Sequence, residues 1–142
     1  MKKIIHLFLL FTVVGLVGCK SDKVNTETIV GNWQVTDAEL KLNNMPEGAE
    51  ALAGAMKKAL LETKYTFEKN GNYSIEAVFP SKGTWEFDEA QNAIILNKEG
   101  EYKATRTYRI LSGSSNKLEV KNDKGEEGYM NLTLERIKEG AE

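Results

Sequence analysis

The chain has 142 residues, of which 41% are hydrophobic and 28% charged, and its 21 acidic and 19 basic side chains give a net charge of −2. An acidic balance without a basic stripe excludes the electrostatic pattern of nucleic-acid binding. The single cysteine excludes a disulfide within the chain, so apolar side chains must hold the fold unaided.

The first 18 residues have the three-part layout of an export signal. Two lysines near the start precede an apolar run over residues 7–17, and a small residue stands directly before Cys19. The run is shorter than the about 20 residues that cross a bilayer, so we expect it to be removed. Residues 16–19, Leu-Val-Gly-Cys, resemble the lipobox of bacterial lipoproteins, whose signal peptidase cuts before a lipid-bearing cysteine.

That resemblance implies a signal peptide over 1–18 and acyl chains such as palmitate on Cys19. Two or more chains suffice for stable anchoring, so we expect the mature chain at the cell envelope, on the outer membrane and facing the periplasm or the surface. The alternative is a soluble secreted protein with a cysteine near its cleavage site. Residues 20–28, KSDKVNTET, are polar and lack apolar periodicity, which predicts a flexible tether.

Loss of the signal also limits the chemistry of the mature chain. Residues 1–19 hold the only histidine and two lysines, so 17 basic and 21 acidic side chains remain, a net charge of about −4. Without histidine or a free thiol, Ser-His-Asp and Cys-His catalysis and imidazole or thiolate metal sites are excluded. We expect no enzyme, no metal and no cofactor.

Residues 29–138 predict a single mainly-β domain. Short runs that alternate apolar and polar residues are separated by turn residues, the pattern of a half-buried antiparallel sheet. Closure of such a meander into an eight-stranded up-and-down barrel removes the exposed edges. The predicted strands are 29–42, 63–69, 72–79, 83–88, 93–98, 101–111, 116–122 and 128–137.

Alternation predicts which side chains face the interior, and a switch of parity in the first strand predicts a β-bulge near Thr36 and Asp37. Before the switch Trp33 and Val35 share one parity, and after it Ala38 and the next leucines share the other. The predicted inward residues of the later strands are Tyr65, Phe67, Tyr73, Ile75, Ala77, Phe79, Trp85, Phe87, Leu118, Val120, Met130, Leu132 and Leu134.

Residues 46–62 break the β pattern. They are rich in Ala, Leu, Lys and Glu, which favour helices, and they place Leu52, Met56 and Leu60 on one face. We expect a helix inserted between the first two strands. Over residues 48–62 it is either a gate across one mouth of the barrel or a static plug packed by that face, and the sequence favours the plug.

Several motifs, taken in order, resemble the small lipocalin-like lipoproteins of bacteria. Gly31-Asn32-Trp33 is similar to the Gly-X-Trp motif of lipocalins, and Arg136 matches the arginine that packs over that tryptophan. Tyr65-Thr66-Phe67, Asn70-Gly71, Gly83-Thr84-Trp85-Glu86 and Leu132-Thr133-Leu134-Glu135-Arg136 extend the likeness over 29–137. The resemblance implies a barrel closed by Arg136 on Trp33, with a ligand inside. The absence of a disulfide and the long helix depart from the family pattern.

The strongest candidate for a polar ligand contact is Arg106, which shares its parity with Tyr108. If that set faces inward, the charge needs a partner: a bound carboxylate, an interior acid or water at the mouth. The alternative is that Arg106 lies at a rim or that the parity slips. The candidate ligand contacts are Arg106, Tyr108, Tyr65, Tyr73, Phe79 and Trp85, although buried tyrosines commonly bond to nearby protein groups instead.

Two functions follow from these features. The first is a monomeric, non-catalytic carrier or sensor that holds a small apolar or amphipathic molecule in the barrel. The alternative is a protein-interaction module at the cell envelope, with a barrel filled by its own side chains. A cavity that reaches Arg106 favours the carrier, and a solid core favours the module.

Overall fold

The structure is a computed structural model that describes residues 23–138 and residue 140. Cys19 and the predicted export signal therefore lie outside the described residues. Within the described part, no helix is long and apolar enough to cross a membrane.

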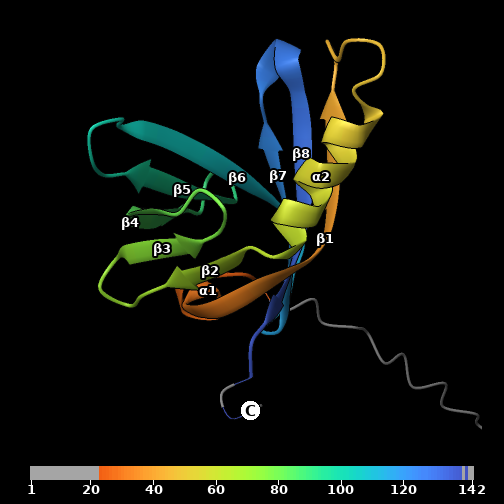
Figure 1. Cartoon of the computed structure of the whole chain (residues 1–142). Helices are drawn as coiled ribbons and strands as arrows, with labels where there is room; N and C mark the ends of the chain where they lie inside the picture. Colours follow the sequence, from red (N-terminus) through yellow and green to blue (C-terminus); the bar gives the residue numbers. More distant parts are fainter. Residues whose placement is uncertain (1–22, 139, 141–142) are drawn as a thin grey trace, which may run out of the picture.

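Eight antiparallel strands form one closed barrel in which each strand pairs with its neighbours in the chain and β8 returns to β1 (Figure 1). This confirms the predicted mainly-β barrel with a helix between its first two strands. The strands are β1 (Gly31–Leu42), β2 (Lys64–Phe67), β3 (Asn72–Glu76), β4 (Ser81–Asp88), β5 (Ala93–Lys98), β6 (Ala104–Gly113), β7 (Lys117–Asp123) and β8 (Gly128–Arg136). Helix α1 (Thr26–Ile29) precedes β1, helix α2 (Glu50–Leu61) follows it, and a 3₁₀ turn, η1 (Gly125–Glu127), precedes β8.

The predicted bulge in β1 is present. The register of β1 against β8 shifts between Val35 and Asp37, where one strand carries an extra residue. The shift turns Ala38 inward after Val35, and both side chains are buried. One long strand can therefore present apolar residues to the core on both sides of the bend.

The interior follows the predicted alternation with one clear exception. Ten of the predicted inward residues are buried, and Ala77 and Phe87 are partly buried against the core. Phe79, in contrast, is 88% exposed. Strand β3 ends at Glu76 and the chain then bends, so strand alternation does not continue to Phe79, and the prediction of an inward side chain is wrong.

Residues 23–28, the described part of the tether predicted over 20–28, lead into a capped helix. Val24 is buried, and Asn25 caps α1 through reciprocal hydrogen bonds with Thr28. The helix places Ile29 in the core with no exposed surface, and β1 begins only at Gly31. A polar stretch is ordered here because its side chains cap a short helix that ends in an apolar residue.

The two ends of the barrel differ in how completely neighbouring strands pair. β1 pairs with β2 only over Gly31–Gln34, and the rest of β1 pairs only with β8. β6 pairs with β7 only from Arg109 onward, so the backbone of residues 104–108 pairs with β5 alone. We call the end with α1 and the start of β1 the closed end, and the opposite end, where these strands separate, the open end.

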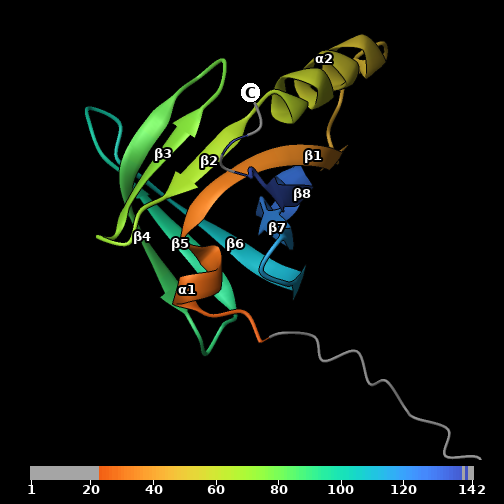
Figure 2. The same cartoon turned by 90° about the horizontal axis from the view of Figure 1, so that it is seen from below.

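Each helix belongs to one of these ends. Helices α1 and α2 lie well apart in both views of the molecule (Figures 1 and 2), and α2 packs against β1, where Lys57 pairs with Asp37 over 3.4 Å. The predicted strand over 101–111 is shorter at its start, since β6 begins at Ala104 and Tyr102 is 74% exposed. The open end is thus bordered by α2 and by the loops that precede β4, β6 and β8.

Candidate functional site

The closed end is locked by Trp33 and Arg136, the pair that the sequence predicted to meet. The Arg136 guanidinium lies 4.3 Å from the centre of the buried Trp33 ring, a cation–π contact. It also donates to the carbonyls of Thr28, Val30 and Ser115. With its donors committed to the protein, this arginine has a structural role.

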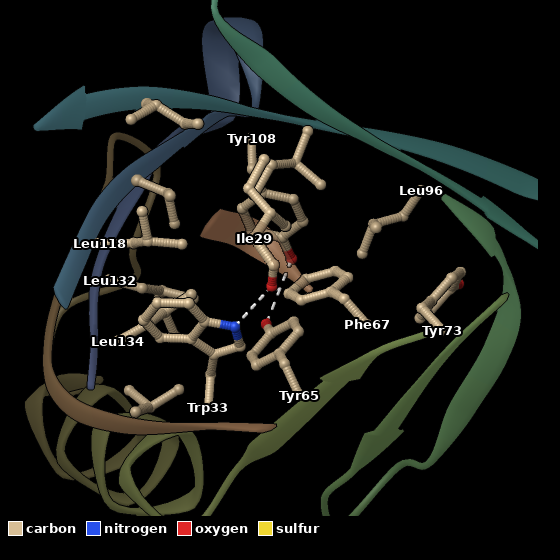
Figure 3. Close-up of a cluster of buried hydrophobic side chains, with 14 of the residues drawn as sticks. Ile29, Trp33, Tyr65, Phe67, Tyr73, Leu96, Tyr108, Leu118, Leu132 and Leu134 are labelled. Atoms are coloured by element: carbon tan, nitrogen blue, oxygen red, sulfur yellow. Dashed lines mark hydrogen bonds between the residues drawn. The ribbon is translucent and has the colours of Figure 1, made fainter. Parts of the chain in front are cut away.

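The same lock explains the glycine of the Gly-X-Trp motif. Gly31 has φ +136°, and a Cβ at this position would overlap Nη1 of Arg136. Trp33 donates its ring N–H to the Ile29 carbonyl over 2.8 Å (Figure 3). Gly31, Trp33 and Arg136 therefore pack closely together with α1 at this end.

The open end holds a cavity of about 440 Å³ between α2 and the inner faces of the strands. Its walls are mostly apolar, with polar groups at the floor and at the mouth. The apolar part includes Leu40, Met56, Leu60, Ile75, Val78 and Met130. This volume lies in the roughly 300–1,000 Å³ range of small-molecule pockets.

Two tyrosines form the polar part of the floor. The hydroxyls of Tyr65 and Tyr108 lie 3.5 Å apart, and both side chains are buried (Figure 3). Burial, the neighbouring Tyr108 and the hydrogen bond to it raise the pKa of Tyr65 well above its usual value of 10.0, and Arg106 opposes this rise. Both tyrosines line the cavity, and the raised pKa keeps the Tyr65 hydroxyl neutral at physiological pH.

Arg106 lines the mouth of this cavity with the same parity as Tyr108, but its side chain is exposed. The exposure arises because β7 does not pair with β6 at this level. The interpretation of Arg106 as a rim residue therefore agrees with the structure, and the interpretation as a buried charge is wrong. Among the described residues, no side chain forms an ion pair or hydrogen bond with its guanidinium.

Four of the six candidate ligand contacts lie together at the cavity, namely Tyr65, Tyr108, Arg106 and the exposed Phe79. The other two line no part of it. The Tyr73 hydroxyl lies 3.2 Å from that of Ser81, and Trp85 donates to the Glu68 carbonyl over 2.9 Å. Because these polar groups are satisfied inside the core, Tyr73 and Trp85 are structural residues.

Asn122 and Lys124 also line the cavity, and neither was a candidate from the sequence. Asn122 has the parity of Leu118 and Val120, both buried. Extending the alternation of β7 by one more step would have found it. Lys124 follows the strand, in the turn before β8, where alternation gives no guide.

Helix α2 lines the cavity without filling it, in contrast to a plug that packs the barrel. No side chain of α2 is fully buried, and Leu52 is 59% exposed. Only the last turn, with Leu60 and Leu61, packs against the core. Gln34 holds this turn by donating to the Leu61 carbonyl over 2.7 Å. Nearer the middle of the helix, Lys57 forms an ion pair with Asp37 of β1 over 3.4 Å.

The arrangement offers an apolar chamber with hydroxyls at its floor and cations at its mouth. Among the described residues, no group of three or more His, Cys, Asp or Glu side chains could hold a metal ion. Chemically, the site can bind a small molecule by apolar contact and orient one polar end.

Comparisons with known proteins describe the fold. The chain matches no family model and no curated protein. Its structure is similar to the crystal structure of a DUF4847 family protein from Bacteroides vulgatus ATCC 8482, with a TM-score of 0.51 and 19% sequence identity over 81% of this chain and 99% of that chain. The likeness shows that the two chains share the fold of a small antiparallel β-barrel.

Proposed function

We propose that this chain is a lipid-anchored carrier or sensor of the cell envelope, which binds a small apolar or amphipathic molecule at the open end of its barrel and does not transform it. The observation that carries the proposal is the cavity of about 440 Å³ that reaches Arg106. A barrel filled by its own side chains would have left no such space.

The character of the cavity wall supports the ligand class. Apolar side chains from α2 and the strands would contact the body of a ligand, and burial of apolar surface contributes about 25 cal/mol per Å². The two tyrosine hydroxyls at the floor and Arg106 at the mouth are few and separated, the pattern of groups that orient a ligand. The resemblance of Gly31-Asn32-Trp33 and Arg136 to lipocalins agrees with this function.

A binding role also fits the state of the polar groups at the floor. The raised pKa of Tyr65, which burial chiefly causes, keeps its hydroxyl protonated, so it is a hydrogen-bonding group and a poor base. The lipobox-like residues 16–19 support the anchor, which metabolic labelling with palmitate would test. Cys19→Ala is expected to abolish the label and to release the chain from membranes.

Cavity filling provides the test of binding. The full chain would be purified from cells that express it and analysed by native mass spectrometry for a co-purifying small molecule, and then titrated with an apolar fluorescent probe. Ala59 lines the cavity, whereas Ala55 on the same helix is exposed and does not. Ala59→Phe is expected to weaken probe binding by about tenfold, about 1.4 kcal/mol, and the matched Ala55→Phe by less than about twofold.

The outcome separates the two candidate functions. If no molecule co-purifies and the probe binds the wild type no better than Ala59→Phe, the carrier is excluded and the protein-interaction module remains. Circular dichroism of both variants would show that each keeps the β fold of the wild type.

A further inference from the structure

The open end has a lateral gap between β6 and β7, which we call the seam. The last paired residues of these strands toward the open end are Arg109 and Lys121. Beyond them, residues 104–108 of β6 pair only with β5. Asn122 spans the seam by donating its side-chain amide to the Thr107 carbonyl over 2.9 Å. A single exposed side-chain hydrogen bond is a weak connection, so the wall can open here.

A second hollow lies on the outer side of the seam. It has a volume of about 490 Å³ and a largely polar lining that includes Thr105, Thr107 and Arg109. Arg106 and Asn122 line both this outer hollow and the cavity. The two spaces therefore meet at these two side chains, and the seam joins the apolar chamber to a polar one.

The outer hollow carries an excess of positive charge. Its lining contains three cations, Arg106, Arg109 and Lys121, and one carboxylate, Asp123. Asp123 is paired with Lys121 over 3.3 Å. Within the described part of the chain, neither arginine forms an ion pair or a side-chain hydrogen bond, in contrast to Arg136 at the closed end. Two guanidinium groups with uncommitted donors can bind one carboxylate or phosphate group.

We infer that the seam holds the head group of an amphipathic anion: a single-chain amphiphile whose apolar tail lies in the cavity and whose carboxylate or phosphate lies in the outer hollow that Arg106 and Arg109 both line. This inference rests on the proposed function and narrows its ligand from apolar or amphipathic molecules to anionic amphiphiles.

The opposite orientation, with the head group at the floor, is disfavoured by the same structure. The floor is buried, and an anion there would lose its hydration. The raised pKa of the Tyr65 hydroxyl has the same origin, since burial also penalises its negative form. The head group is better accommodated at the seam, where it keeps contact with water and meets two cations.

Arg109 allows a selective test because it lines the outer hollow and not the cavity. The full chain would be titrated calorimetrically at pH 7.5 with dodecanoate, dodecyl phosphate and dodecanol, each below its micelle concentration, and with acetate. The variant is Arg109→Gln. The control is Lys64→Gln, which removes an exposed cation from β2, a strand that does not border the seam.

For the wild type, we expect one of the two anions to bind about tenfold more tightly than dodecanol, the effect of one charge-assisted contact. The tighter anion identifies the head group as carboxylate or phosphate. Arg109→Gln is expected to remove this preference and to leave dodecanol binding unchanged, whereas Lys64→Gln changes neither. Acetate, which has no tail, is expected to bind at least about a hundredfold more weakly than dodecanoate.

Each contrary outcome has its own meaning. If dodecanol and both anions bind the wild type equally, or if Arg109→Gln keeps the preference, the seam is not the head-group site and the carrier function stands. If acetate binds as tightly as dodecanoate, the hollow binds simple anions and the inference is wrong. If no dodecyl compound binds, the proposed function fails as well.

A spectroscopic measurement checks the inference independently of affinity. With carboxyl-labelled ¹³C-dodecanoate, the carboxyl pKa of the bound ligand is expected to be lower in the wild type than in Arg109→Gln, since a nearby guanidinium favours the ionised form. An identical titration midpoint in the two proteins would overturn the placement of the head group.

Discussion

Arg136 at the closed end and Arg106 at the open end are the same kind of side chain in opposite situations. Arg136 covers Trp33 and donates to three backbone carbonyls. Arg106 stands at a cavity mouth where the neighbouring strand has separated. The difference arises from strand pairing. At the closed end the paired strands bring backbone carbonyls close to Arg136. At the open end β6 and β7 do not pair at the level of Arg106, so this arginine is exposed.

The comparison teaches how one small barrel can be both stable and open. The largest fully buried side chains include Ile29, Trp33 and Leu118, and α1 and Arg136 close over this part. The open half has the cavity, the unpaired stretch of β6 and a helix without a fully buried residue. We therefore expect variants at the closed end to affect mainly stability and variants at the open end to affect mainly binding.

The largest expected effect is loss of packing at the closed end. Leu118→Ala, at a side chain with 0% exposure, is expected to lower the free energy of unfolding by about 3 kcal/mol. Met130→Ala is expected to cost only about 1 kcal/mol, because Met130 lines the cavity and its truncation enlarges an existing space. Urea unfolding measures both values. Equal costs would mean that the open half is packed as tightly as the closed half.

Substitution of Arg136 and of Arg106 is expected to give the next largest difference in stability. Arg136→Ala is expected to cost about 2 kcal/mol, since it removes charge-assisted hydrogen bonds and the contact with Trp33. Arg106→Ala is expected to change stability by less than about 0.5 kcal/mol, because the side chain is exposed and forms no ion pair with any described residue. Arg136→Lys is the matched control for charge. It should recover little of the lost stability, because lysine lacks the planar guanidinium group and its several hydrogen-bond donors. A large loss in Arg106→Ala would contradict its assignment to the binding site.

The smallest effect concerns the floor between the two halves and depends on pH. At pH 8, Tyr65→Phe is expected to cost about 1 kcal/mol, because Tyr108 loses its hydroxyl partner. Burial raises the pKa of Tyr65 in the folded protein above 10.0. Above that pH the unfolded tyrosine ionises first, so the wild type loses stability that the variant does not lose. Urea unfolding should therefore show a smaller difference in unfolding free energy between the wild type and Tyr65→Phe at pH 11 than at pH 8. An equal difference at the two pH values would contradict the raised pKa of Tyr65.

Local sequence patterns predict the elements of this fold and much of its closed end. The parity switch in β1 gave the bulge at Val35–Asp37, and the composition of residues 46–62 gave α2. Trp33 and Arg136 were paired by resemblance and meet in the structure. These features depend on short-range periodicity or on a recurrent motif, both of which are visible in one sequence.

The open end was harder to predict because it depends on long-range pairing. The relative lengths and registers of strands far apart in the chain determine the point at which β6 and β7 stop pairing. No local sequence pattern indicates this point. Phe79 was misplaced because alternation was extended beyond the end of β3. Helix α1 was missed because four residues are too few to show a helical period, although the Asn25–Thr28 capping pair is a local signal.

The position of α1 has a consequence for the direction in which the barrel opens. Val24, which follows Lys23, packs beside Gly113 at the closed end, and β8 ends there too, where Ile137 donates its backbone N–H to the Asn32 carbonyl. Four residues lead from Cys19 to Lys23, and they span at most about 14 Å. If Cys19 carries lipid as proposed, this short connection favours an orientation in which the closed end faces the membrane and the mouth faces the aqueous side. A bound molecule would then enter and leave on the aqueous side, so that delivery from another membrane or protein is easier than exchange with the membrane that holds the anchor.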